Sequence, residues 1–161
     1  MAMTLIEEVS VGAGGVAAIE FQAIPQDGQD LLCLFSFKAT TAGADMILKL
    51  NNTTNSIVTV YGQGRDPFSN SSDRLGLAES NSPEANTFHI LNLYVSNYTL
   101  ARKHSFVSDL VVASNSSSNF ASWQSITYGL SASTSPVTTL KLNPSPGLFA
   151  QHCTASLYSI S

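Results

Sequence analysis

Apolar and polar side chains alternate with a period of two along most of this chain, and that pattern restricts the fold more than any other feature. From residue 30 to residue 38 both sets of alternate positions are largely apolar, as in a strand between two packed layers. The segments 46–50, 91–95 and 106–112 show the half-buried version, with one apolar and one polar face. No segment carries the sustained 3.6-residue apolar stripe of an amphipathic helix. The sequence therefore predicts an all-β chain.

Turn-forming residues separate about nine predicted strands, and their order favours one layered domain. Clusters of Gly, Pro, Asn and Asp punctuate the strands, whereas the polar stretch 62–86 predicts a long mid-chain loop with one helical turn near Arg74–Leu77. Many short strands without crossover helices indicate an antiparallel β-sandwich of jelly-roll type. We expect this domain at 12–161, preceded by an N-terminal arm or first strand at 1–11. The remaining predicted strands are 5–11, 16–21, 57–61, 120–130, 137–142 and 149–160.

Composition excludes several classes of function. Only 11% of residues are charged and the net charge is −4, so no basic field attracts nucleic acid or anionic lipid. No apolar run reaches the roughly 18 residues needed to cross a bilayer, and the first eight residues lack the basic start of a signal peptide. We therefore expect synthesis in a cytosol. Cys33 and Cys153 lie in apolar runs and are expected as buried thiols, with a disulfide between them as the alternative.

The residue types needed for catalysis are scattered. The chain has three histidines, at His89, His104 and His152, and no nucleophile-elbow pattern accompanies any of them. His152 and Cys153 are adjacent, so in a strand their side chains point to opposite faces and do not pair. We therefore predict no enzyme and no cofactor.

The acidic residues give no stronger signal. Three aspartates near early turns suit Asx-turns, and a calcium site is the alternative interpretation. Three glutamates lack the aromatic platform that usually accompanies a pair of catalytic carboxylates in a sugar cleft. The aspartates are Asp27, Asp30 and Asp45, and the glutamates are Glu20, Glu79 and Glu84.

Two aromatic side chains are candidates for a surface contact. In the strand 120–130, alternation groups Ile126 and Tyr128 on one side and Trp123 and Ser125 on the other. If the first group is buried, Trp123 projects outward and anchors a partner or stacks on a sugar; the alternative is a second buried face. Phe68, in the predicted loop, is the second candidate.

Both ends of the chain resemble small virion proteins of tailed bacteriophages. The opening Val11–Gln26 has the Gly-rich turn, the short strand and the Ile-Pro dipeptide common in that group, followed by Leu31-Leu32. The segments Thr139–Leu142 and Ala155–Ile160 resemble its closing strands, although Ser159 stands where glycine is common. The stretch 62–86 carries no part of the resemblance.

The resemblance implies a jelly-roll-like domain in a head decoration (cement) protein or in a tail fibre or appendage, often trimeric. We expect a capsid decoration protein on the virion surface, made in the host bacterial cytoplasm. Its expected partners are the major capsid protein and its own copies, as a homotrimer, with no nucleic acid or membrane. The candidate assembly arm is Met1, Met3, Leu5 and Ile6, which would add a strand to a neighbour. The alternative is an appendage domain that binds host surface carbohydrate through Trp123 or Phe68.

Overall fold

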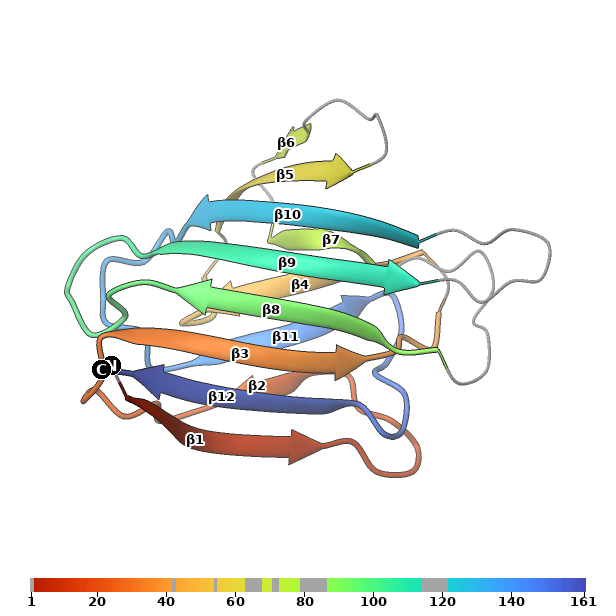
Figure 1. The fold of residues 1–161 in the computed structure, drawn as a ribbon, viewed down its shortest axis with the longest axis horizontal. Coiled ribbons are helices and arrows are strands. Elements are labelled where there is room, and N and C mark those ends of the chain that lie inside the picture. The colour runs from red at the N-terminus through yellow and green to blue at the C-terminus, as the bar shows by residue number, and fades with distance from the viewer. Residues whose placement is uncertain are drawn as a thin grey trace.

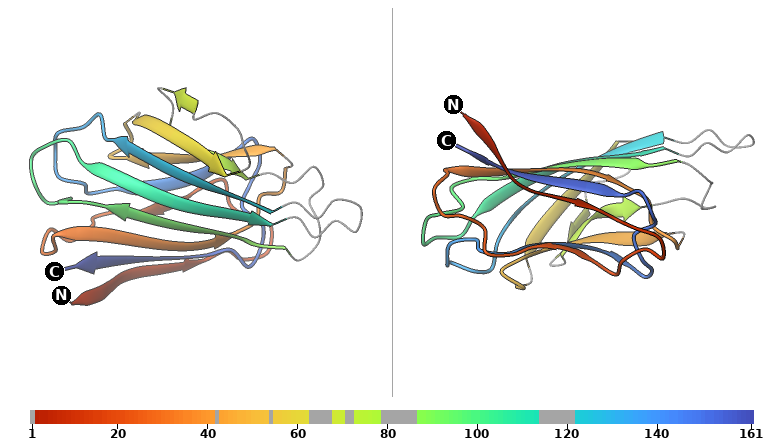
Figure 2. Two further views of the ribbon diagram at one scale, coloured as in Figure 1. Left: turned by 45° about the horizontal axis from the view of Figure 1, so that its top comes forward. Right: turned by 90° about the horizontal axis from the view of Figure 1, so that it is seen from below.

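Two antiparallel sheets, packed face to face, make up the chain (Figure 1 and Figure 2). The computed structural model describes residues 2–41, 43–53, 55–62, 68–70, 73–78, 87–113 and 122–161. These residues contain twelve strands and no helix. The predictions of an all-β chain and of two antiparallel layers are confirmed.

The larger sheet has eight strands and the smaller has four. In spatial order the large sheet runs β1 (Met3–Ser10), β12 (Thr154–Ile160), β3 (Asp30–Phe37), β8 (His89–Val95), β9 (Ser105–Ala113), β10 (Ser122–Leu130), β5 (Ser56–Gly62) and β6 (Phe68–Asn70). The small sheet runs β2 (Ile19–Phe21), β11 (Leu140–Ser145), β4 (Ala44–Leu50) and β7 (Arg74–Ala78).

The strand pairs are nested in the sequence. Strand β4 pairs with β7, β3 with β8, β2 with β11 and β1 with β12, so each pair encloses the one before it. The pairing of β12 with β3 in the large sheet, and of β11 with β4 in the small sheet, then joins two nested pairs in each sheet. Backbone hydrogen bonds in both directions between Ala2 and Ser161 extend the outermost pair. The two ends of the chain consequently lie side by side (Figure 1).

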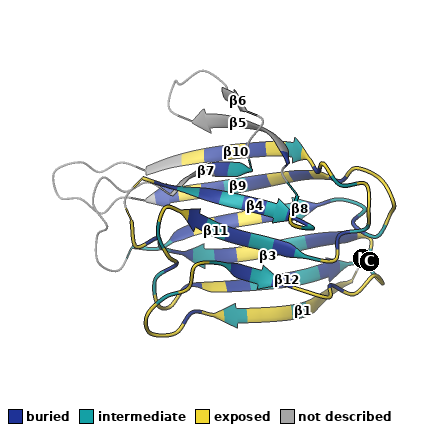
Figure 3. Ribbon diagram, turned by 180° about the vertical axis from the view of Figure 1, so that it is seen from behind, coloured by how far each residue is buried: buried dark blue, intermediate teal, exposed yellow. Residues whose placement is uncertain are grey.

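The core lies between the sheets and is built by the predicted alternation. On β3 the residues Leu31, Cys33, Phe35 and Phe37 are all buried, while those between them are not (Figure 3). Strand β4 repeats the pattern, with alternate residues of the small sheet buried against the large one. Phe149 contacts Phe35 and Phe37 edge-on, with ring centroids 4.9 Å and 6.2 Å away, respectively. One apolar cluster therefore joins both layers.

Buried polar groups close the end of the sandwich where β3 begins and β8 ends. The Asp30 carboxylate accepts hydrogen bonds from the Tyr94 hydroxyl and, at 2.7 Å, from the Asn97 amide N–H. The fully buried Tyr98 donates from its hydroxyl to the Pro25 carbonyl at 2.6 Å. The hydrogen bond to Asp30, followed by burial, raises the pKa of Tyr94 to about 12. These contacts tie the loop before β3 to the loop after β8.

His104 fastens the same end to the loop after β10. Its ring is almost fully buried, with Nδ1 3.1 Å from the Asn97 carbonyl oxygen and Nε2 2.9 Å from that of Ser135. Its backbone N–H donates to the Ser131 hydroxyl at 2.9 Å. His104 is therefore a structural residue that joins two loops.

The structure corrects the interpretation of the polar stretch 62–86. The predicted helical turn at Arg74–Leu77 is wrong, because Arg74–Ala78 forms β7 and pairs with β4. Leu75 is fully buried there, and its spacing from Leu77 suits a strand as well as a turn. Strand β6 also falls in the stretch, which is therefore not a continuous loop.

Candidate interaction surfaces

The outer face of the large sheet exposes a group of apolar side chains. Six of them come from the neighbouring strands β8, β9 and β10, and each is at least 39% exposed. We call this group the β8–β10 patch; it consists of Ile90, Val107, Val111, Ile126, Tyr128 and Leu130. Single exposed apolar residues are common, but a contiguous group marks a contact surface more often than chance.

Strand register makes the patch contiguous. Ile90 lies directly opposite Val111, and Val107 lies directly opposite Tyr128. Ile126 and Leu130 flank Tyr128 at every second position of β10, and residues two apart in a strand share a face. Opposed side chains on adjacent strands have Cβ atoms about 5 Å apart, so the two members of each opposed pair touch or nearly touch.

A short polar row crosses this patch. Asn92 on β8 is opposite Asp109 on β9, which in turn is opposite Ile126. Gln124 donates from Nε2 to the Asp109 carboxylate at 2.7 Å, so this carboxylate already has a donor within the chain. From β3 to β10, Asp30 and Asp109 are the charged residues among the described positions that share the outer face with the patch, and Asp30 is buried and bonded to Tyr94 and Asn97. The face is thus mostly apolar, and both of its carboxylates have donors within the chain.

Three tyrosines occupy one row of the same face. Tyr158 on β12 aligns through Leu32 with Tyr94 on β8, and Tyr94 aligns through Val107 with Tyr128 on β10. Successive tyrosines are therefore two strands apart, or about 9.6 Å. Tyr128 is half exposed, and the other two are partly buried.

The predicted assembly arm forms the edge of the large sheet. Residues 3–10 are β1, which pairs with β12 on one side, and no described strand pairs with its other side (Figure 1). Met3 and Leu5 are more than half exposed, whereas Ile6 packs partly against the core. Met1 lies outside the described residues. A register irregularity between Leu5 and Glu7 interrupts the edge, and such bulges limit unspecific strand pairing.

The structure contradicts the reasoning that made Trp123 a surface candidate. Ile126 and Tyr128 are exposed and Ser125 is buried, so the group expected in the core faces outward. Trp123 is paired with Val112 on β9, and its side chain lies outside the described part. Phe68 begins β6 rather than lying in a loop, and its side chain is likewise outside the described part.

Hydroxyl groups line the inner side of β9 and β10. Thr127 is fully buried and donates from Oγ1 to the Leu75 carbonyl of β7 at 2.7 Å. The Oγ atoms of Ser108 and Ser125 are buried without a hydrogen-bond partner. The bond from Thr127 links the two sheets where β7 faces β10, and it explains why a polar residue is buried there.

The histidines do not form a reactive group. His89 is buried against the edge of Phe37, at a centroid distance of 5.4 Å, and its Nδ1 has no hydrogen-bond partner. Burial, followed by the charge of Lys38, lowers the pKa of His89 to about 4. His152 is exposed in a turn with a positive φ of 72°. Together with the enclosed His104, these residues lie on separate segments.

Both cysteines are free and buried, as predicted. Cys33 is opposite Leu157 on β12, which is four residues beyond Cys153. Four strand residues span about 13 Å, whereas a disulfide needs Cα atoms within about 7 Å. The Cys153 sulfur instead accepts a hydrogen bond from the Lys38 N–H at 3.2 Å. Burial raises the pKa of the Cys33 thiol to about 12, so the thiol is unreactive.

Two of the aspartates considered for a calcium site, Asp30 and Asp45, have structural partners. Asp45 pairs with Arg74 across β4 and β7 at 2.8 Å, and burial, partly opposed by Arg74, raises the pKa of Asp45. Asp30 is held by the tyrosine and amide described above. In the part of the chain that the structure describes, no three His, Cys, Asp or Glu residues gather into a group able to hold a metal ion.

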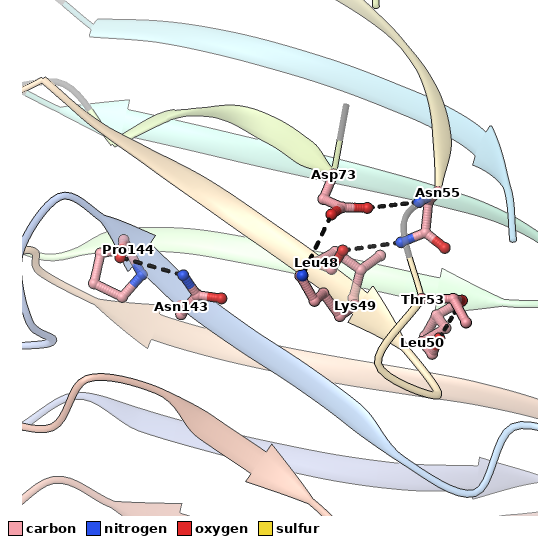
Figure 4. Close-up of polar contacts among 8 residues, drawn as sticks. All are labelled: Leu48, Lys49, Leu50, Thr53, Asn55, Asp73, Asn143 and Pro144. Carbon is pink, nitrogen blue, oxygen red and sulfur yellow. Dashed lines mark hydrogen bonds and ion pairs between the residues drawn. The ribbon is translucent and has the colours of Figure 1, made fainter. Parts of the chain in front are cut away.

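Asp73 organises the crossover from β4 to β5 (Figure 4). Its carboxylate accepts from the Asn55 N–H, its backbone oxygen accepts from the Leu48 N–H at 2.8 Å, and Lys49 Nζ lies 3.9 Å from Oδ2. Asn55 donates in turn from Nδ2 to the Leu48 carbonyl at 2.9 Å. The bonds between Asp73, Asn55 and Leu48 hold the backbone in place where the chain bends. The cluster therefore positions the chain and presents no reactive group.

Comparisons with known proteins add no relative. No protein-family model matches the chain, and no curated protein or solved structure is significantly similar to it. The described part of the chain contains no helix that is long and apolar enough to span a membrane.

Proposed function

We propose that the domain is a jelly roll. Setting aside β5, β6, β9 and β10 as two added hairpins leaves eight strands. In chain order these pair first with eighth, second with seventh, third with sixth and fourth with fifth, as a long hairpin rolled into two sheets does. The spatial orders that remain, β1-β12-β3-β8 and β2-β11-β4-β7, support this topology.

The function that we propose is structural: a capsid decoration protein of a tailed phage, which stabilises the head by binding across capsomers. The observation that carries it is the open edge of β1, where Met3 and Leu5 are exposed beside an unpaired strand. The resemblance of Val11–Gln26 and Ala155–Ile160 to small virion proteins supports it, since these segments flank β2 and form β12. Such a protein acts by adding buried contacts to the shell and needs no turnover.

Strand addition gives this attachment a physical basis. An edge strand offers unpaired N–H and C=O groups, and a neighbour's strand satisfies them through a backbone ladder. The irregularity between Leu5 and Glu7 divides β1 into two regular stretches; Met3 and Leu5 lie in the first, whereas the second begins with the charged Glu7 and Glu8. The attachment is therefore expected to depend on the side chains of Met3 and Leu5 as well as on the backbone.

The test is binding to shells that lack the protein. The full chain is mixed with undecorated capsids, and bound copies per shell are counted by quantitative mass spectrometry, alongside the melting temperature of the shell. We expect saturable binding in many copies and a more stable shell. The double variant Met3→Ser, Leu5→Ser should fold but lose attachment, whereas Leu148→Ser, at an exposed apolar residue of a distant loop, should not. Undiminished binding by the double variant would exclude β1 as the attachment site.

One observation favours the alternative, an appendage domain that binds host surface carbohydrate. Tyrosines stack on sugar rings, and the row of Tyr158, Tyr94 and Tyr128 gives a regular aromatic platform beside Asn92 and Gln124. Glycan-array binding that Tyr128→Ala abolishes, without any binding to shells, would replace the decoration role by this one.

A further inference from the structure

We propose that the β8–β10 patch is covered by a second copy of this chain, in a two-fold, face-to-face pair of large sheets. This inference goes beyond attachment to a shell and does not depend on it, because β1 and the patch are separate surfaces. Strand β1 is an outer edge of the large sheet, whereas β8, β9 and β10 lie in its interior.

The charge of the face favours an uncharged partner. Asp30 and Asp109 are its charged residues among the described positions from β3 to β10; Asp30 is buried and bonded to Tyr94 and Asn97, and Gln124 donates to Asp109. A basic or acidic partner would therefore find almost nothing to pair with, and burying its charges would be unfavourable. A second copy brings only the same carboxylates, each of which already has a donor within its own chain.

The polar groups on the face also suit a contact between identical surfaces. At a two-fold interface, each group lies against a surface that contains the same groups. Asn92, Gln124 and Ser105 carry amides and hydroxyls, which both donate and accept hydrogen bonds and can therefore pair with their own kind. These uncharged polar groups can thus be hydrogen-bonded in a contact between two copies of the face.

The size of the face matches what a stable pair needs. Strands β12, β3, β8, β9 and β10 are neighbours, and at about 4.8 Å between strands and 3.3 Å per residue they cover roughly 600 Å² of flat sheet. Side-chain relief increases the accessible area, and a standard interface takes about 800 Å² from each partner. Two sheets stacked about 10 Å apart with nearly aligned strands would repeat the packing inside the domain.

The patch also supplies anchors for such a contact. Ile126, Tyr128 and Val107 are exposed neighbours on β10 and β9, and a two-fold pair buries each of them twice. Aromatic and large apolar side chains at the centre of an interface carry most of its binding energy. The pair is therefore expected to be most sensitive to changes at these positions.

The test is the molar mass of the full chain in solution, by light scattering and sedimentation velocity up to about 100 µM, where an interface of standard size is occupied. We expect particles of two copies. Ile126→Lys replaces an apolar side chain of the contact by an ammonium group opposite Asp109, and desolvating that charge should weaken the pair by two orders of magnitude or more. Leu148→Lys adds the same charge at an exposed apolar residue outside the patch and should leave the pair intact. Circular dichroism and thermal melting establish that both variants are folded.

Several results would overturn the inference: a monomer at the highest concentration, particles of three copies, or equal effects of the two lysine variants. The shell-binding assay separates this failure from failure of the proposed function. A monomer that decorates shells refutes only the pairing, whereas a pair that ignores shells refutes only the decoration role. If Ile126→Lys abolishes binding to glycans in a chain that is already monomeric, the face serves carbohydrate instead.

Discussion

Replacing His89 by phenylalanine should make the protein more resistant to acid. The His89 ring is buried against Phe37, its Nδ1 has no partner, and its pKa in the folded chain is about 4. In the unfolded chain a histidine has its ordinary pKa of about 6.5. Between these two values the unfolded chain binds more protons, so the stability of the wild type is complete above pH 6.5 and falls as the pH drops toward 4.

The size of the effect follows from that difference. Relative to pH 7, the His89 contribution at pH 4.5 lowers the free energy of unfolding by about 2 kcal/mol. Phenylalanine keeps the edge contact with Phe37 and removes the titrating nitrogen. Urea unfolding of both proteins at the two pH values measures the effect, because the carboxylates titrate equally in both and cancel in the difference. Parallel losses of stability in the two proteins would refute the assignment, as would an NMR titration of His89 near pH 6.5.

Three further substitutions test the packing of the described fold by urea unfolding. Tyr98→Phe removes the buried hydroxyl that donates to the Pro25 carbonyl and should cost about 1–3 kcal/mol; an unchanged midpoint would show that the bond contributes nothing. Ser125→Ala removes a buried hydroxyl without a partner, so we expect stability within about 1 kcal/mol of wild type or above it, and a larger loss would reveal a bonded hydroxyl. Gly15→Ala should destabilise by about 2 kcal/mol or more, because φ is +72° and a Cβ would lie 2.4 Å from a backbone oxygen. The matched control Gly12→Ala meets open space and should have little effect, so equal losses would contradict this reasoning.

Most strands were predictable because burial alternates along them. The segments 30–38, 46–50 and 91–95 were predicted as strands and correspond to β3, β4 and β8. Strand β7 was missed because five residues with two leucines give too short a pattern to separate a strand from a turn. Its pairing with β4 is a long-range contact that the local sequence does not contain.

The candidate surfaces were harder to predict. Alternation on β10 separates Ile126 and Tyr128 from Ser125 and Thr127 but does not say which pair is buried. Hydrophobicity favours burying the first pair, whereas the hydrogen bond from Thr127 to the Leu75 carbonyl satisfies the buried hydroxyl of Thr127. A signal was nevertheless present, since β8 and β9 carry apolar residues on both faces. In an antiparallel sheet with one face toward solvent, such strands point to a contact on the outer side.

The nested order of strand pairs also affects how the chain assembles. β4·β7 closes the shortest loop of the four nested pairs, while β1·β12 must bring Met3 to Ile160. During synthesis β1 and β2 therefore leave the ribosome long before their partners β12 and β11. Until then the backbone N–H and C=O groups of β1 and β2 have no strand to pair with. Pairing over such sequence distances is slow, so the sheets are expected to close from the middle of the nested pairs outward.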